Sequence, residues 1–509
     1  MNLRQALRVG VPAALAGVGA AEAVAAVRGS GSFLDAAGKL VVDRGPRSAV
    51  EIVIPVLRSA DKAAIRAGAL ATVLAYGALL GGSHRSGPRD LAATTALAAA
   101  GVVVSGRFGS VTGHRRSHTQ DLLAVTAGSA VGVAALRMPI RAQMCTALLG
   151  AAALTWSQRQ AARSTPPTTC GSGDACGKDL LPSPRHPLPP PVDGAEAWPG
   201  ATPLMTPVEY FYVTDVTMRP PVVDSGMWRL RIEGAVDRPA TMSYTDLLGE
   251  ELVEFDAAMV CVHNRLGWHR LGNQRWTGVP LHRLIERARP RPTAAVVVTR
   301  SVDGWECSLP LDLLADRDAY LVLGMAGRPL TAAHGYPARV FVPGLYGQYA
   351  GAKWVTHIRL QSTPNEDYWS RRGWTRGPLQ VRPMARIDNP VAGQVLPAVS
   401  GTVTVCGVAW SPATAVAAVE VSLDAGPWRP AELAGNLSAT SWRRWRAHLE
   451  VPAGRHVVRA RCLGVDGQIQ EEVVRRPFPS GVSGYHQIGF TVRPSDPVSP
   501  VAPRPLGTG

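Results

Sequence analysis

The chain has 509 residues, a hydrophobic fraction of 46% and a formal net charge of +15 at pH 7. This length exceeds that of one ordinary domain and predicts two to four domains. The charge does not indicate a nucleic-acid-binding protein, because the arginines are dispersed and no RNA-recognition, helix-turn-helix or zinc-finger pattern accompanies them. Basic loops that set membrane topology or contact anionic lipid headgroups are the expected use of this charge.

The first 160 residues are rich in alanine, valine, leucine and glycine, and predict a multi-pass transmembrane anchor of four or five helices over residues 1–160. A transmembrane helix needs about 20 apolar residues, so the last two runs are short. A helical hairpin buried among the other helices is an alternative for residues 122–156. No cleavable signal peptide is evident. The apolar runs cover residues 9–27, 67–82, 91–105, 122–136 and 144–156.

Four further segments follow the apolar region. Residues 161–205 form a Pro-rich linker, expected to hold the next domain away from the bilayer. Residues 206–386 have the mixed pattern of an α+β domain. Residues 387–495 contain short strands and turn signals typical of an immunoglobulin-like sandwich, and residues 496–509 predict a disordered tail. In the α+β segment we expect strands at residues 228–232, 295–299 and 339–342, and helices at residues 246–252 and 280–288.

Two cysteine pairs bear on the side of the membrane that the later domains face. Cys170 and Cys176 flank a Gly/Ser loop, while Cys406 and Cys462 lie on expected strands of the sandwich. Either disulfide would indicate an oxidising compartment. Cys406, however, shares strand parity with polar residues and would need a bulge to reach Cys462. We expect a bacterial plasma-membrane protein with its soluble domains on the outer face. The sequence does not decide whether either disulfide forms.

Cys261 closes an apolar strand and opens a polar loop that contains glycine and arginine. A thiol at such a position can be reached by a bound ligand, and nearby cations keep a cysteine sulfur ionised. For a lone cysteine, a buried structural role at a strand end is the ordinary alternative. The pattern around it therefore has to decide between the two interpretations.

Several segments resemble, in the right order, those of the sulfite oxidase family, and the resemblance covers about residues 200–492. It implies a molybdenum–molybdopterin (Mo-pyranopterin) cofactor with Cys261 as the one protein ligand of the metal, and a soft thiolate suits such a site. It also implies that the immunoglobulin-like domain mediates homodimer formation. The segments are residues 206–212, 259–265, 271–281, 301–305, 324–330, 333–347, 353–355, 368–374 and 442–445.

The resemblance also implies which residues bind the cofactor. The guanidinium of Arg339 has the fork geometry that a phosphate needs, and His334 and Lys353 add further donors. Taken singly, each has an ordinary alternative: a turn residue, a surface strand residue or a lysine that extends to solvent. Their order relative to Cys261 favours the binding role. The expected cofactor-binding residues are Tyr212, Asn264, Asp303, His334, Arg339, Gly351 and Lys353.

Departures from the family pattern bear on the substrate. Leu323 stands where sulfite-oxidising members place a tyrosine, and no arginine follows the entry aromatic residues. Arg265, Arg270 and Arg443 are candidates to hold an anionic substrate. We expect oxygen-atom transfer on a small, anionic substrate. The alternatives are a sulfoxide or N-oxide reductase on the same fold and a cofactor-free membrane-tethered scaffold.

The chain has no Cys-x-x-Cys-His motif and no recognisable ferredoxin cysteine set, so no haem is expected. Electrons would therefore pass to or from an external carrier. Membrane quinone and a c-type cytochrome are both candidates, and the sequence does not separate them.

Overall fold

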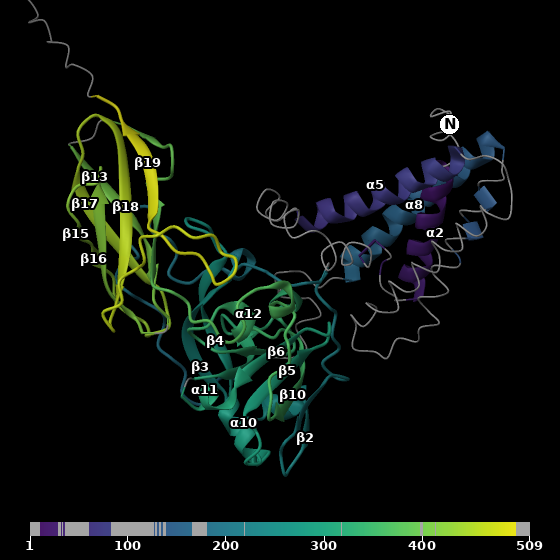
Figure 1. Cartoon of the computed structure of the whole chain (residues 1–509), viewed down its shortest axis with the longest axis horizontal. Coiled ribbons are helices and arrows are strands. Elements are labelled where there is room, and N and C mark those ends of the chain that lie inside the picture. Colours follow the sequence, from purple (N-terminus) through teal and green to yellow (C-terminus); the bar gives the residue numbers. More distant parts are fainter. Residues whose placement is uncertain are drawn as a thin grey trace, which may run out of the picture.

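The computed structural model describes residues 11–28, 32, 34–35, 61–82, 127, 130–131, 134–135, 139–164 and 181–494, apart from 218, 317, 398–400 and 413. Figure 1 shows three parts: a group of N-terminal helices, a central domain and a β-sandwich, with the central domain between the other two.

Three long helices make up the helical part. They are α2 (Val11–Arg28), α5 (Asp61–Gly82) and α8 (Ile140–Ser164). Helices α2 and α8 cross closely because glycines face each other there: a Cβ on Gly19 would lie 2.1 Å from the carbonyl oxygen of Gly150. Glu22 of α2 is 1% exposed. Its carboxylate accepts hydrogen bonds from Leu34 N (2.9 Å) and from the hydroxyls of Ser32 (2.8 Å) and Ser157 (3.2 Å).

The predicted transmembrane anchor is wrong. Among the described helices, none is long and apolar enough to cross a bilayer. The predicted spans at residues 9–27, 67–82 and 144–156 lie in α2, α5 and α8, which are built largely from alanine and glycine and carry charged residues within or beside these runs. The span at residues 91–105 lies outside the described residues, as does most of the one at 122–136. The expected plasma-membrane location rested on this anchor, so the same finding overturns it.

The central domain is mostly β, with short helices, rather than an even mixture of helix and strand. In its first sheet β1 and β10 are parallel, with Arg231 paired with His357, and the other neighbours are antiparallel. This sheet has the order β2 (Ala240–Ser243), β1 (Arg229–Gly234), β10 (Val355–Gln361), β5 (Val296–Ser301) and β6 (Glu306–Pro310). The second sheet has the order β3 (Val253–Val260), β4 (Leu271–Pro280), β7 (Tyr320–Met325) and β8 (Arg328–Pro329), and β9 (Arg339–Phe341) pairs with β7.

Short helices connect these strands. The three predicted strands are confirmed as β1, β5 and β9, and the helix predicted at residues 280–288 is α10. The other predicted helix begins and ends earlier, because Ser243 and Asp246 form a capping box at its start and Gly249 caps its end. The helices are α9 (Tyr244–Leu248), α10 (Leu281–Arg287), α11 (Leu311–Asp316) and α12 (Gly347–Ala350), with 3-10 turns η4 (Val208–Tyr210), η5 (Ala332–His334) and η6 (Ser370–Arg372).

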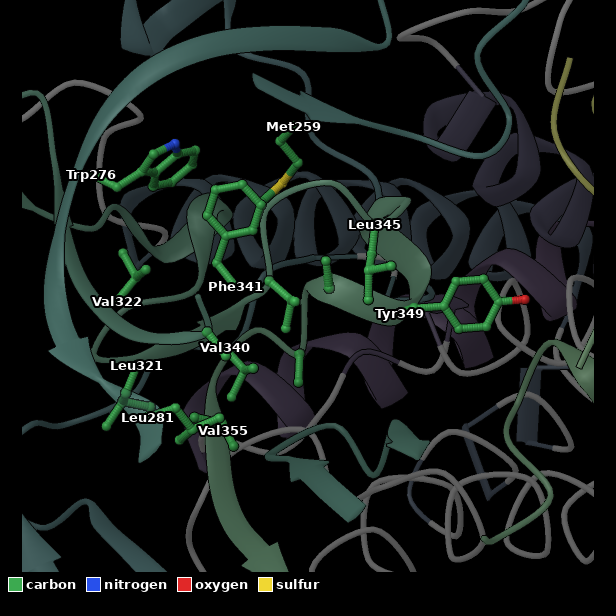
Figure 2. Packing of buried hydrophobic residues seen from close by; sticks show 14 of the residues in the cluster. Met259, Trp276, Leu281, Leu321, Val322, Val340, Phe341, Leu345, Tyr349 and Val355 are labelled. Atoms are coloured by element: carbon green, nitrogen blue, oxygen red, sulfur yellow. The ribbon is translucent and has the colours of Figure 1, made fainter. Parts of the chain in front are cut away.

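The core of the central domain is built from buried side chains of both of its sheets and of the turns that follow β9. Figure 2 shows part of this core, in which the rings of Trp276 and Phe341 meet edge to face with centroids 5.1 Å apart. Both side chains are fully buried, and Met259 packs in the same cluster. Because Met259 stands two residues before Cys261, the apolar core fixes the end of β3 from which the cysteine loop leaves.

The second domain is a two-sheet β-sandwich whose core contains Trp445. Cys462 lies in that core, while the Cys406 side chain points out toward the carbonyl of Pro199 at 3.7 Å. Both cysteines are free, so the possible disulfide between them does not form. Cys170 and Cys176 lie outside the described residues. One sheet has the order β11 (Met384–Asn389), β13 (Thr402–Trp410), β17 (Arg443–Glu450) and β16 (Glu432–Leu433). The other has the order β12 (Val395–Leu396), β19 (His486–Val492), β18 (Gly454–Gly464), β14 (Val416–Leu423) and β15 (Arg429–Pro430).

The described part of the predicted linker, residues 181–205, packs against both domains instead of acting as a spacer. The buried guanidinium of Arg444 in the sandwich forms an ion pair with Asp193. Arg275 in the central domain donates to the carbonyl of Pro189 at 2.6 Å. The indole of Trp442 donates to the carbonyl of Leu204 at 2.8 Å. These contacts fix the segment to both domains.

Candidate cofactor pocket around Cys261

Cys261 lies at the point where β3 leaves the buried sheet. Its amide donates to the Arg270 carbonyl at 2.9 Å, and its own carbonyl accepts from the amide of Asn264 at 2.9 Å. The Asn264 side chain accepts from the Arg270 amide at 3.0 Å and so closes the loop. The cysteine is 5% exposed, and its sulfur lies 3.9 Å from Nδ1 of His263. This loop holds one thiol at the wall of a pocket.

The pocket beside Cys261 is partly open to solvent and has a cavity volume of about 80 Å³. Of the predicted site residues it brings together Cys261 with six of the seven cofactor-binding candidates. Those six are Tyr212, Asp303, His334, Arg339, Gly351 and Lys353.

Arg339 is a buried cation on β9, 5% exposed. Its Nη1 donates to the His334 carbonyl at 3.1 Å, and its Nη2 contacts the sulfur of Met259 at 3.2 Å. Burial lowers the pKa of Arg339 to about 10, so the group stays charged at pH 7. Gly351 makes room for it, since a Cβ there would lie 2.9 Å from Nη2.

His334 ends the 3-10 turn η5 and is 2% exposed. Its Nδ1 and the Thr331 hydroxyl are 2.7 Å apart, and its Nε2 lies 3.4 Å from the Phe211 carbonyl. Burial, with the charges of Arg339 and Lys353, lowers the pKa of His334 to about 4. The imidazole is therefore neutral at pH 7.

Asp215 joins the pocket to the helical part. One carboxylate oxygen accepts from Lys353 Nζ at 3.0 Å and the other from Lys62 Nζ of α5 at 2.7 Å. Burial opposes ionisation of Asp215, but the two ammonium groups and the Thr217 hydroxyl outweigh it, and the pKa of the carboxyl lies well below its usual range. Burial lowers the pKa of Lys353, an effect that Asp215 opposes.

Five polar atoms of the pocket wall are buried without a hydrogen-bond partner: Thr214 Oγ1, Ser301 Oγ, Arg339 Nε, and Oε1 and Nε2 of Gln348. Buried polar groups ordinarily have partners, and an orphan of this kind requires an explanation. A ligand with several anionic or carbonyl oxygens would satisfy the four that can donate, and an N–H group of the ligand would satisfy Gln348 Oε1. The donor set therefore fits the phosphate and pterin of a molybdopterin.

The metal end of such a cofactor also fits. Within the described residues no group of three or more His, Cys, Asp or Glu side chains could hold a metal ion. Cys261 supplies the pocket wall with a thiolate that could bind a dithiolene-held molybdenum. Thiolate sulfur is a soft ligand that suits this metal environment.

Four of the predicted site residues do not line the pocket. Asn264 is 1% exposed and shapes the cysteine loop instead. Arg265 lies over the Trp268 ring at 5.1 Å. The charges of Arg265 and Arg270 nevertheless reach the pocket, where burial first and these arginines second lower the pKa of His263 to about 3.

Arg443 also lies outside the pocket lining. On β17, its guanidinium donates to the main-chain carbonyls of Ala434 at 2.6 Å and Val416 at 3.2 Å. These bonds hold it within the sandwich, so the structure does not place it at the substrate side. Leu323, at the position expected to correspond to a tyrosine, is fully buried in the core and does not line the pocket.

Sequence reasoning missed several residues of the pocket wall. Asp215 was not among the expected site residues, although a buried acid close to lysines is the natural partner of Lys353. His263 and Trp369 lie in segments 259–265 and 368–374, which carry the family resemblance, but no role was expected for either residue. The further wall residues that were missed are Val213, Thr214, Val216, Met259, Val262, Ser301, Trp305, Ala333, Gly347, Gln348 and Trp354.

A buried thiol beside buried cations and unsatisfied donors defines a cofactor-dependent oxidoreductase. Residues 217–369 match the family model described as "Oxidoreductase molybdopterin binding domain". The chain is 32% identical over 151 residues to "Uncharacterized oxidoreductase YuiH" of Bacillus subtilis (strain 168), which covers 30% of this chain and 74% of that protein. The chain belongs to this molybdopterin-binding oxidoreductase family, as a relative of sulfite oxidase.

Further relatives and one solved structure are similar to parts of the chain. The mitochondrial sulfite oxidase of Homo sapiens is 29% identical over 293 residues, covering 48% of this chain and 53% of that protein. The chain thus spans about half the length of the mitochondrial sulfite oxidases that it matches. The "Nitrate reductase [NADPH]" of Emericella nidulans is 27% identical over 211 residues, covering 37% and 24%. The solved structure of the sulfane dehydrogenase SoxCD from Paracoccus pantotrophus aligns with a TM-score of 0.46 at 21% identity, covering 53% and 80%.

Proposed function

We propose that this protein catalyses oxygen-atom transfer on a small substrate with a molybdenum–molybdopterin cofactor, and that Cys261 is the protein ligand of the metal. The observation that carries the proposal is the pocket that joins one buried thiol to buried cations and unpartnered donors. When bound, the cofactor supplies the metal that exchanges an oxygen atom and two electrons with the substrate.

The chain's own residues would position the cofactor. Arg339 and Lys353 would neutralise its phosphate, and Thr214 and Ser301 would donate to its oxygens. His334 is neutral, and its two ring nitrogens contact the Thr331 hydroxyl and the Phe211 carbonyl, so it would shape the site without adding charge. The electrons would pass to or from an external carrier, and the sandwich is the candidate surface for a homodimer.

An anionic, sulfite-like substrate is the first candidate, because sulfite oxidases are among the relatives and the charges of Arg265 and Arg270 reach the Cys261 side of the pocket. A neutral sulfoxide or N-oxide is the second. The specific observation in its favour is the aromatic wall of Trp305 and Trp369, together with neutral His263. Sulfur and methyl groups of such substrates pack well on aromatic rings.

The first test is molybdenum content in the wild-type protein and Cys261→Ser, produced in a host that makes the cofactor. We expect near-stoichiometric metal in the wild type, an altered electronic absorption in Cys261→Ser, and a loss of turnover of about 100-fold or more, the scale of 2.7 kcal/mol in the barrier. Cys307→Ser is the matched control, since this buried thiol lies 3.3 Å from the Tyr349 carbonyl and outside the pocket wall. No molybdenum in a folded wild type would contradict the proposal.

A substrate panel then separates the two candidates. Sulfite oxidation is followed with ferricyanide as acceptor, and reduction of dimethyl sulfoxide and trimethylamine N-oxide with reduced viologen as donor. If the arginines serve an anion, Arg270→Ala raises KM for sulfite. If the aromatic wall serves a neutral oxide, Trp305→Ala raises KM for the sulfoxide and leaves sulfite unchanged.

A further inference from the structure

A series of ring contacts leads from the thiol of Cys261 toward the surface of the central domain. The sulfur lies 3.9 Å from Nδ1 of His263. The His263 ring centroid is 5.2 Å from that of Trp369, which is 5.0 Å from that of Tyr368. Each ring meets the next edge on, at interplanar angles of 62° and 88°. Tyr368 is half-buried, so the series ends at solvent.

A second branch starts from the same histidine. The His263 and Trp374 ring centroids are 4.4 Å apart, and Trp374 is 5.3 Å from Phe478, which belongs to the sandwich part of the chain. Trp374 is 8% exposed and does not line the pocket, whereas Trp369 does. Trp374 therefore belongs to the ring series without being in reach of a substrate. We call His263, Tyr368, Trp369 and Trp374 the ring series.

The surface at the end of the ring series is basic. The Arg372 guanidinium lies 3.6 Å over the Tyr368 ring. Arg371 and Arg376 are exposed beside it. Of the two acids in this segment, Glu366 pairs with Arg376 at 3.2 Å, and Asp367 Oδ1 accepts from the amides of Trp369 and Ser370 at 2.8 Å. This segment thus carries three arginines and two acids, a net charge of +1, and one of the arginines, Arg376, is paired with Glu366.

We propose that the ring series carries electrons between the metal at Cys261 and a one-electron carrier protein with an acidic face, which docks on Arg371, Arg372 and Arg376. This inference rests on the proposed function. Delocalised π orbitals separated by short gaps couple two redox centres better than saturated side chains do. Opposite charge raises the rate of encounter and loses this effect in salt.

The electron balance is simple. Each oxygen-atom transfer leaves two electrons on the metal, or takes two from it. They cross the ring series one at a time, and each carrier molecule takes or gives one. No bond forms or breaks in the rings, and the two protons that balance the two electrons when water supplies or receives the oxygen atom exchange with solvent through the open side of the pocket.

The test separates electron exit from substrate chemistry. The loaded full chain is reduced with dithionite, which needs no knowledge of the substrate, and reoxidation of the metal is followed by stopped-flow absorption. The oxidants are plastocyanin, an acidic protein, and cytochrome c, a basic one, and both are too large to enter the pocket. We expect Trp369→Leu and Trp374→Leu to slow reoxidation by plastocyanin at least tenfold at unchanged molybdenum content.

Three controls keep the result interpretable. Trp374→Phe keeps a ring and should restore most of the rate. Trp428→Leu removes a sandwich tryptophan that contacts Tyr485 and lies outside the ring series, and should change nothing. Plastocyanin binding to the cofactor-free protein, measured by calorimetry, should weaken with salt and with Arg371→Glu, whereas cytochrome c should not bind better at low salt.

The outcomes are distinct. Wild-type reoxidation rates in both Leu variants would overturn the electron path. A Trp369→Leu variant that is slow to be reduced by substrate but normal in reoxidation would make the ring a wall of the substrate site instead. A wild type without molybdenum would overturn the proposed function, and with it this path. Tighter binding of cytochrome c than of plastocyanin would overturn the acidic partner.

Discussion

Asp215 shows how much one buried charge can organise. Its side chain is 3% exposed, and it balances two ammonium groups: that of Lys62, 153 residues before it in the chain, and that of Lys353, 138 residues after it. Breaking a buried ion pair by removing one partner costs about 3–5 kcal/mol, because the remaining charge is left uncompensated. Here the uncompensated charges would be those of Lys62 and Lys353.

We expect Asp215→Asn to lower the free energy of unfolding by about 3 kcal/mol at pH 7, measured by urea denaturation. The pKa of Asp215 is lowered in the folded protein, while an unfolded aspartate titrates near 3.9. The stabilisation is therefore present above about pH 4 and is lost as the pH falls through the folded pKa. The gap between wild type and variant should shrink below pH 4. An equal gap at pH 7 and pH 3.5 would contradict this origin.

At this scale the sequence predicted the pocket well but not its periphery. Cys261, His334, Arg339 and Lys353 stand in motifs with fixed spacing, and the fold brings them to one wall. Arg443 was expected near the substrate, but β17 carries two adjacent arginines, Arg443 and Arg444, whose side chains have different partners. Motif spacing alone does not show which surroundings each side chain faces. The role of Asp215 depends on a lysine far away in the sequence, which no local pattern reveals.

The cysteine loop, residues 261–270, is the element that links the pocket to the sandwich. Gly267 has a φ of +72°, and a Cβ there would lie 2.3 Å from Nε2 of His486 in β19. The His486 Nδ1 accepts from the Ile387 amide at 3.0 Å. Because this hydrogen bond holds the His486 ring in place, the ring cannot easily move away from a Cβ added at Gly267.

Gly267→Ala should therefore destabilise the protein more than a positive φ alone explains. Gly304→Ala is the matched control, since Gly304 has a φ of +81° but no atoms within 4 Å of the added Cβ. The control should cost about 1–2 kcal/mol, and Gly267→Ala about 2 kcal/mol beyond that. Thermal melting of both variants checks the difference, and equal melting temperatures would refute the contact with His486.

Strands were easier to predict than the environment of the helices. Alternation identified β1, and β-branched runs identified β5 and β9, because these signals are local. The prediction of transmembrane helices was wrong for a physical reason. A helix rich in alanine and glycine can pack against another helix as well as against lipid. The close contact of Gly19 with Gly150 and the bonded carboxylate of Glu22 show the first of these outcomes.

The three parts of the molecule are tied together by charge as well as by packing. Asp35 joins Arg66 of α5, at 2.5 Å, to Arg219 of the central domain, at 2.9 Å. Lys62 adds its bond to Asp215 four residues earlier on α5. The helical part is therefore attached beside residues 212–216 of the pocket wall, through partly buried ion pairs.

Lys62→Ala should loosen this attachment without emptying the pocket, because Asp215 keeps Lys353. We expect amides of α5 to exchange with solvent about tenfold faster, which corresponds to about 1.4 kcal/mol. Arg283→Ala removes a charge from an exposed pair with Glu251 and should leave α5 unchanged. Hydrogen exchange with mass spectrometry measures both, and unchanged exchange of α5 in Lys62→Ala would show that the ion pair does not hold the helix.

The clamped segment 181–205 has a consequence for how the protein is made. Asp193 leaves the ribosome well before its partner Arg444, from which it is separated by 251 residues. Domains generally fold in the order of their synthesis, so the central domain must fold while the buried carboxylate of Asp193 still lacks its cation. Segment 181–205, and with it the pocket, would become fully rigid only after strand β17 has emerged from the ribosome. A nascent chain stalled before residue 443 should therefore load the cofactor poorly, even with every pocket residue already synthesised.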